Sequence, residues 1–229
     1  MSFPDTVYLT TLTFDCYGTL IDWETGAIAA LRPLLLRHGI PLSDDEIVTA
    51  FQDIEGALCE LPYMPYRAVL AGVVEEFGQR FNFPVRAGDR EVLAWSVASW
   101  RPFPDTVEAL RALAARYRLA IISNIDDDLF ATTVHQLGVE FELVVTAEQA
   151  RCYKPNSAIF EEAFRRLAVE PRLIVHVAEG VTEIPPVRRL GGATVWVRRH
   201  GRSARLLTEA PDLEVPNLKS LLAYMGVVA

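Results

Sequence analysis

Residues 7–20 read VYLTTLTFDCYGTL, and the fold prediction starts from this stretch. Its first part, residues 7–14, is rich in β-branched and aromatic side chains, so it predicts a buried strand. Asp15 follows directly, and a turn containing Gly18 separates this carboxylate from the hydroxyl of Thr19. A carboxylate at the end of a strand can act as a nucleophile when a nearby cation keeps it ionised.

Further along the chain, strand-like and helix-like segments alternate. Strands are predicted at residues 119–122, 143–146, 173–178 and 193–197, and helices at residues 107–117, 129–137 and 158–167. This alternation is typical of an α/β fold, in which helices cover both faces of a parallel sheet. Reactive groups in such folds lie at the carboxyl ends of the strands, so polar residues that follow strands are the candidates for a site.

The chain between residues 24 and 100 has a different pattern, with helical periodicity and no convincing strand. Helices are predicted at residues 25–38, 43–60, 66–81 and 88–99. Ser43 followed by Glu46 is a capping box, which marks the start of the second of these helices. We therefore expect a helical cap domain at residues 22–101, inserted into a core domain made of residues 1–21 and 102–229. Such an insertion can close over a site at the strand ends.

Length and composition limit the class of protein. The chain has 229 residues, 51% of them hydrophobic, which suits one α/β domain with an insertion. It has no apolar run of about twenty residues, so we expect no membrane partner. The net charge of −8 leaves no basic surplus for phosphates, so we expect no nucleic acid partner. Three widely spaced cysteines and a start unlike a secretory signal favour a reduced, cytoplasmic protein.

Polar clusters follow the predicted strands in a fixed order. Ser123 and Asn124 come directly after the strand at 119–122, where they suit an anion site or a helix cap. Lys154 precedes a proline in a loop before a helix, where its ammonium group can pair with Asp15. Glu183 ends the segment that follows the strand at 173–178, where acidic oxygens can bind Mg²⁺ or position a lysine and a water. Each cluster taken alone is a weak signal.

Taken in order, these elements resemble the haloacid dehalogenase superfamily, and more narrowly its 2-haloacid dehalogenase branch. The resemblance covers essentially the whole chain. It rests on Asp15-x-Tyr17-Gly18-Thr19-Leu20, the helical insertion, Ser123-Asn124, Tyr153-Lys154-Pro155, and the strand around Val177 followed by an acid. It implies a Rossmann-like core with strand order 3-2-1-4-5, a cap over the nucleophile, and an aspartyl-enzyme intermediate.

The residue type at the position of Tyr17 distinguishes the branches of this superfamily. Phosphatases usually carry a second aspartate two residues after the nucleophile, as the general acid and base for the leaving alcohol. Halide needs no proton to leave, and the dehalogenase branch typically has tyrosine at this position. The sequence therefore favours a hydrolase that acts on carbon–halide bonds of short 2-haloacids, with a halocarboxylate and water as its small-molecule partners. A homodimer is compatible with the sequence.

The resemblance also implies residue roles. The catalytic residues would be Asp15 as nucleophile, Thr19 to hold its carboxylate, Lys154 to keep it anionic, and Glu183 to support the lysine and the hydrolytic water. The substrate-binding residues would be Tyr17, Ser123, Asn124 and Arg67. No cofactor and no metal are implied.

Several positions depart from the branch and leave two alternatives open. Ala178 and Gly180 stand where dehalogenases carry a serine and an asparagine, and Glu183 stands where they carry an aspartate. Gln52 falls where the cap normally supplies an arginine. Arg67 is the nearest replacement in the cap, but the interpretation of Arg67 as a solvated arginine at a helix start is equally favoured. One alternative is a Mg²⁺-dependent phosphatase that uses acids of the segment 179–183. The other is a catalytically weakened binding protein.

Overall fold

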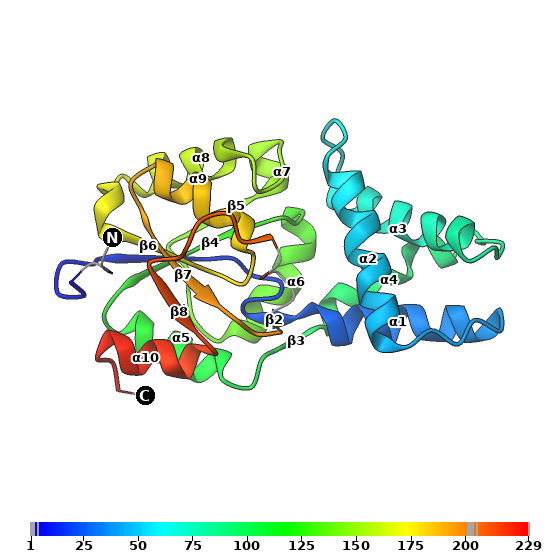
Figure 1. Ribbon diagram of the computed structural model, residues 1–229, viewed down its shortest axis with the longest axis horizontal. Coiled ribbons are helices and arrows are strands. Elements are labelled where there is room, and N and C mark those ends of the chain that lie inside the picture. Colours follow the sequence, from blue (N-terminus) through cyan, green and yellow to red (C-terminus); the bar gives the residue numbers. More distant parts are fainter. Residues whose placement is uncertain (1–2, 4, 201–203, 205, 229) are drawn as a thin grey trace.

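The computed structural model describes residues 3, 5–200, 204 and 206–228. Its centre is a six-stranded sheet in which all paired strands run parallel (Figure 1). In spatial order the strands are β5 (Leu143–Thr146), β4 (Arg118–Ser123), β1 (Thr11–Phe14), β6 (Ile174–Ala178), β7 (Ala193–Val197) and β8 (Leu213–Val215). Helices cover both faces of this sheet, so the predicted α/β class is confirmed.

The strand order differs from the expected 3-2-1-4-5. A sixth strand, β8, pairs with β7 at the edge of the sheet. Counted without the two short strands β2 (Ile21–Asp22) and β3 (Arg101–Pro102), the other five strands do follow the expected sequence. The prediction missed β8 because a strand of three residues is too short to show a period-two pattern.

The first strand is also shorter than predicted. Val7 and Tyr8 are 71% and 69% exposed and lie in a turn, and β1 begins only at Thr11. β1 lies between β4 and β6, and all four of its residues are buried. A central strand of a parallel sheet is covered on both faces, which explains why the threonines of β1 are buried as fully as its apolar residues.

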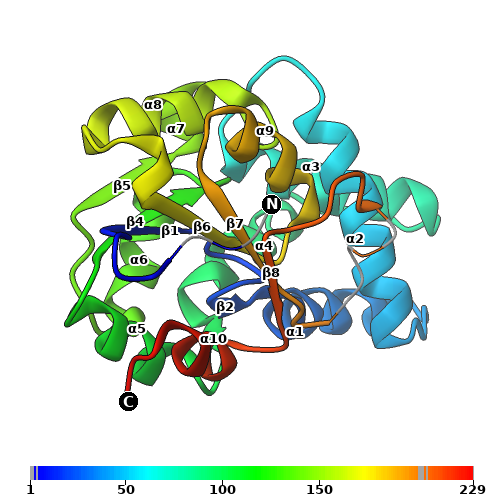
Figure 2. The ribbon, with the colours of Figure 1, turned by 60° about the vertical axis from the view of Figure 1, so that its left-hand side comes forward.

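Helices that follow β3 in the chain cover the two faces of the sheet (Figures 1 and 2). On one face lie α7 (Ala147–Ala150), α8 (Ser157–Leu167) and α9 (Ile184–Arg189). On the other face lie α5 (Thr106–Ala114), α6 (Asp127–Leu137) and α10 (Leu218–Met225). The aromatic rings of Phe160 and Phe164 on α8 pack in one cluster with Ile122 and Val145 of the sheet. This burial of apolar surface fixes the strand ends that carry the polar clusters.

A group of helices lies to one side of the sheet, between β2 and β3, which pair antiparallel (Figure 1). They are α1 (Trp23–Arg37), α2 (Asp44–Cys59), α3 (Tyr66–Arg80) and α4 (Val92–Ser96). The predicted capping box at Ser43 and Glu46 is present. The helix predicted at 88–99 is broken into α4 and two flanking 3-10 turns. Of the described helices, none has the length and apolar character that crossing a bilayer requires.

Candidate active site

Asp15 stands at the end of β1, and the turn after it folds back on its carboxylate. Gly18 has φ +100°, a left-handed conformation that favours glycine, and a Cβ there would meet the Trp23 ring at 3.3 Å. The turn closes with the amide of Leu20 donating to the carbonyl of Cys16 at 2.8 Å. This brings Thr19 back to Asp15, where the Thr19 hydroxyl donates to Asp15 Oδ2 at 2.6 Å. The turn therefore fixes one of the two carboxylate oxygens.

Lys154 holds the other oxygen of Asp15. Its Nζ donates to Asp15 Oδ1 at 2.6 Å and to the carbonyl of Ile122 at 2.9 Å, and it lies 2.8 Å from Glu183 Oε2. These three partners use all three donors of an ammonium group. The side chain of Asn124 binds the backbone of Lys154 with two hydrogen bonds. It accepts from Lys154 N at 2.7 Å and donates to Lys154 O at 3.2 Å. The predicted lysine–aspartate pair is present, and it is buried.

Burial and neighbouring charges act in opposite directions on these groups. Burial alone would lower the pKa of Lys154, but the charges of Asp15 and Glu183 outweigh it and raise that pKa. Burial likewise works to raise the pKa of Glu183, yet Lys154 and His176 bring it below its ordinary value. For Asp15 burial dominates and raises the pKa, against the pull of Lys154. Lys154 therefore stays a cation between two carboxyl groups.

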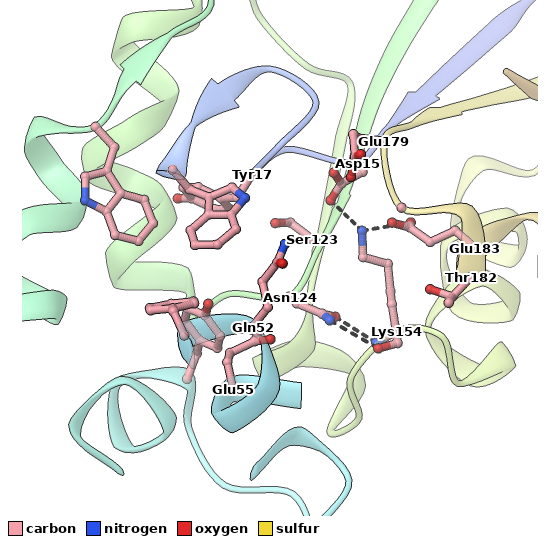
Figure 3. A pocket seen from close by; sticks show the side chains of 15 residues that line it. Asp15, Tyr17, Gln52, Glu55, Ser123, Asn124, Lys154, Glu179, Thr182 and Glu183 are labelled. Carbon is pink, nitrogen blue, oxygen red and sulfur yellow. Dashed lines mark hydrogen bonds and ion pairs between the residues drawn. The ribbon is translucent and has the colours of Figure 1, made fainter. Parts of the chain in front are cut away.

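These groups line a pocket of about 200 Å³, which has room for a ligand of a few non-hydrogen atoms (Figure 3). Figure 3 shows Lys154 between Asp15 and Glu183, with Gln52 and Glu55 on the opposite, helical side. The lining residues are Asp15, Tyr17, Trp23, Phe51, Gln52, Glu55, Tyr66, Trp100, Ser123, Asn124, Lys154, Glu179, Gly180, Thr182 and Glu183. Among these lining residues Lys154 is the only basic one.

Ser123 offers the pocket an unused hydroxyl. It ends β4, is fully buried, and its Oγ has no hydrogen-bond partner within the described part of the chain. Leaving a buried hydroxyl unpaired costs about 1–3 kcal/mol. A ligand with an acceptor oxygen would remove this cost, whereas the side chain of Asn124 is already committed to Lys154.

Tyr17 lines the pocket with its ring. Its hydroxyl is 2.8 Å from the hydroxyl of Thr133 on α6, and its ring packs edge-to-face on Trp100 with centroids 5.7 Å apart. Burial raises the pKa of Tyr17 well above its ordinary value. The phenol therefore stays neutral, and it supplies an apolar wall rather than an acid two residues after Asp15.

Arg67 is not brought into the pocket. Its guanidinium group pairs with Asp128 at 2.6 Å, and its side chain is not among those that line the cavity. The cause is Asp126, whose carboxylate accepts from the backbone amides of Tyr66 at 2.7 Å and Arg67 at 2.8 Å. This carboxylate caps α3 from the core and directs Arg67 toward the first turn of α6. Of the two interpretations of Arg67, the solvated residue at a helix start agrees with its position better than the substrate-binding residue does.

Sequence reasoning missed polar residues that contribute to the site. Gln52 was considered only as the loss of an arginine, and Glu55 was not considered, yet both line the pocket from one face of α2. Their spacing of three residues was the available signal. Burial raises the pKa of Glu55. His176, which lies in the predicted strand at 173–178, is buried, and its partners are Thr13 and Glu183.

Comparison with known proteins places this site in a family. The family of haloacid dehalogenase-like hydrolases matches residues 9–191. Haloacetate dehalogenase H-2 from Moraxella sp. strain B is 25% identical over 94% of the chain and 97% of that protein. A glyceraldehyde 3-phosphate phosphatase from Methanothermobacter thermautotrophicus is 31% identical, over 74% of the chain and 76% of that protein.

The same family appears among solved structures. An L-2-haloacid dehalogenase structure has a TM-score of 0.81 to this chain at 22% identity, and the match covers 95% of this chain and 99% of the other. At this level of identity the likeness shows the fold. The family match spans most of the chain and includes Asp15, Ser123, Lys154 and Glu183, so it establishes family membership in addition to the fold. The chain belongs to the family of haloacid dehalogenase-like hydrolases.

Proposed function

We propose that this hydrolase removes the halide from short 2-haloacids through an ester on Asp15. One observation carries the proposal: Asp15 is held by Thr19 and by a buried Lys154 at the edge of a small pocket, and the residue two positions on is Tyr17 rather than an acid. A nucleophile fixed beside a cation suits displacement of a leaving group that needs no proton. The relatives named haloacetate dehalogenase and L-2-haloacid dehalogenase support this choice.

The proposed reaction has two steps. First, a carboxylate oxygen of Asp15 attacks the carbon that bears the halogen, a C–O bond forms, and the halide leaves with the electron pair of the broken bond. The substrate carboxylate accepts a hydrogen bond from Ser123. Water then attacks the aspartyl carbonyl and gives a proton to Glu183, which returns it to the departing 2-hydroxyacid oxygen. Asp15 is regenerated as a carboxylate, and its remaining proton passes to solvent.

We also propose that residues 22–101 act as a cap domain over this site, with residues 1–21 and 102–229 as the core. Aromatic side chains of the helical segment, Trp23, Phe51 and Tyr66, line the pocket opposite the strand ends. They exclude water from the reacting atoms, which strengthens the electrostatic contacts inside. Asp126 joins the two parts through the amides at the start of α3.

A metal-dependent phosphatase is the second candidate. The relative named glyceraldehyde 3-phosphate phosphatase favours it, as does the position of Glu179 and Glu183 after β6. Two features of the site count against it. Glu183 Oε2 is already bonded to Lys154 and His176, and Tyr17 replaces the acid that a leaving alcohol needs.

A halide-release assay tests the proposed function. The purified protein is expected to release halide from chloroacetate, fluoroacetate or 2-chloropropionate, with no change when EDTA is added. Ion chromatography measures the halide, and a panel of phosphate esters is assayed in parallel. Absence of halide from every haloacid contradicts the proposal, and phosphate release that EDTA abolishes favours the second candidate.

The Ser123→Ala variant distinguishes a role of this hydroxyl in substrate binding from a role in the stability of the fold. The variant is expected to lower kcat/KM by about 10- to 100-fold, because a hydrogen bond to a charged group contributes about 1.5–3 kcal/mol. Its free energy of unfolding should not fall and should rise by up to about 1–3 kcal/mol, because the variant removes a buried hydroxyl that has no partner in the described structure. Steady-state kinetics and urea unfolding measure both effects. Ser99→Ala, at an exposed position, is the control, and an unchanged kcat/KM for Ser123→Ala would remove this residue from the site.

A further inference from the structure

A continuous set of buried hydrogen bonds extends the active site behind Glu183. His176 on β6 lies opposite Thr13 of β1 in the register of the two strands. Its Nδ1 is 2.9 Å from the Thr13 hydroxyl, and its Nε2 is 2.9 Å from Glu183 Oε2. That same carboxylate oxygen lies 2.8 Å from Lys154 Nζ. His176 is 1% exposed, so no water competes for these bonds from the bulk solvent.

The chemistry of the partners assigns the protons. An ionised carboxylate only accepts hydrogen bonds, so His176 Nε2 must carry a proton and donate it toward Glu183. Nδ1 can then accept from the hydroxyl of Thr13, which fixes the tautomer and the ring orientation. Glu183 Oε2 thereby receives two donors, from His176 and Lys154, and these contacts fix the position of this oxygen.

Gly180 makes room for this arrangement. A Cβ at position 180 would lie 2.7 Å from Glu183 Oε1, which is closer than real contacts allow. Its backbone, with φ −70° and ψ 100°, is open to any residue, so the contact with the end of the Glu183 side chain, and not the conformation, decides the effect of a side chain here. A side chain at 180 would push the carboxylate of Glu183 away from its two donors. Glu183 is longer than the aspartate of the branch, and it forms one structural unit with Gly180 and His176.

We propose that His176 is a positioning residue that holds Glu183 in place for hydrolysis of the aspartyl ester, and that Gly180 is the residue that gives Glu183 its space. The proposal rests on the proposed dehalogenation. Gly180 and Glu183 both line the pocket, and in the proposed reaction Glu183 Oε1, the oxygen near position 180, takes the proton of the hydrolytic water. The polar side chains expected at positions 178 and 180 are replaced by this single, firmly held carboxylate.

The two half-reactions respond differently to loss of His176. Three titratable groups face Glu183: Lys154 from the loop before α8, Asp15 from the end of β1, and His176 from β6. Without His176, Lys154 still holds Asp15, so ester formation continues. Glu183 loses one of the two donors to its Oε2 and turns more freely, so ester hydrolysis slows. The pKa of Glu183 also rises, because His176 is one of the groups that lower it.

Single-turnover experiments on the intact protein with 2-chloropropionate test this. In His176→Phe the ester on Asp15 is expected to accumulate, with hydrolysis slowed by about 10- to 100-fold and ester formation changed by less than about threefold. The acidic limb of the hydrolysis step should move to higher pH, because Glu183 must be ionised to accept a proton. His176→Gln, which retains an N–H donor, should recover much of the rate.

Val175→Ala is the control, because Val175 is a buried neighbour on β6 whose apolar side chain cannot hydrogen-bond to Glu183. Mass spectrometry of the quenched protein measures the ester, and chloride release measures the first step. The proposal is overturned if His176→Phe accumulates no ester and keeps the wild-type pH limb, or if Val175→Ala shows the same accumulation. Wild-type protein that releases no halide would instead contradict the proposed function.

Two further measurements keep the proposal independent of the histidine variants. Gly180→Ala should slow ester hydrolysis, and in a Glu183→Asp background the same change should cost little, because the shorter acid leaves the space free. Additive effects of the two changes contradict the role of Gly180. NMR of histidine labelled with ¹⁵N should show His176 with its proton on Nε2, and a proton on Nδ1 alone overturns the positioning role even without turnover.

Discussion

Asp15→Asn is expected to abolish halide release, with a fall in kcat of about 10⁴-fold or more, the size of loss that follows removal of an enzymatic nucleophile. The amide has the shape of the carboxylate but lacks the charge and the lone-pair reactivity that displacement of halide needs. No ester is expected on residue 15 after incubation with a haloacid. The first half-reaction is lost, so this phenotype differs from that of a variant in which only ester hydrolysis is slow.

The measurement combines halide release with mass spectrometry of the intact chain. Asp53→Asn on the exposed side of α2 is the matched control and should keep wild-type turnover. Lys154 retains Glu183 and the carbonyl of Ile122 in the Asp15 variant, so the protein is expected to fold. Substantial halide release by Asp15→Asn, or an ester on another residue, would refute the role of this carboxylate.

Features that depend on local pattern could be predicted from the sequence. Buried parallel strands appear as short apolar runs and amphipathic helices by their periodicity, and the strands at 143–146 and 193–197 match their predicted bounds. The convergence of Asp15, Ser123 and Lys154 follows from the same logic, because parallel strands end at one edge of the sheet. The Asp15–Lys154 bond of 2.6 Å is the physical outcome of that topology.

Features that depend on contacts between distant segments could not be predicted. Arg67 lies outside the pocket because Asp126, 59 residues further along the chain, binds the start of α3. The spacing of Gln52 and Glu55 places them on one face of α2, but that this face meets the pocket depends on how α2 packs over the strand ends. His176 looks like any buried histidine until the fold places Thr13 at one nitrogen and Glu183 at the other.

Lys154→Met is expected to impair both catalysis and stability. Methionine has nearly the length of lysine but no charge, so Asp15 loses the cation that orients its carboxylate. A fall in kcat of about 10²- to 10³-fold follows from losing such an electrostatic contact in a buried site. The free energy of unfolding should fall by about 3–5 kcal/mol at neutral pH, because two buried carboxylates, Asp15 and Glu183, lose the cation between them.

The stability loss should depend on pH in a defined direction. In wild type the pKa of Glu183 lies below its ordinary value, so its contribution to stability is present above the ordinary pKa and is lost as the pH falls. In Lys154→Met the pKa values of Asp15 and Glu183 both rise, since each loses an attraction that lowers it. Protonation then removes the unpaired charges. The stability difference from wild type should therefore shrink as the pH falls.

A double variant isolates the charge as the cause. Asp15→Asn added to Lys154→Met removes one of the two unpaired carboxylates and leaves Glu183 bonded to His176. The double variant should therefore be more stable than Lys154→Met alone. Lys219→Met on the exposed side of α10 is the natural control, because the chain has only these two lysines. Chemical unfolding at several pH values measures all four proteins. If Asp15→Asn instead lowers the stability of Lys154→Met further, the loss in Lys154→Met comes from packing and not from the unpaired carboxylates.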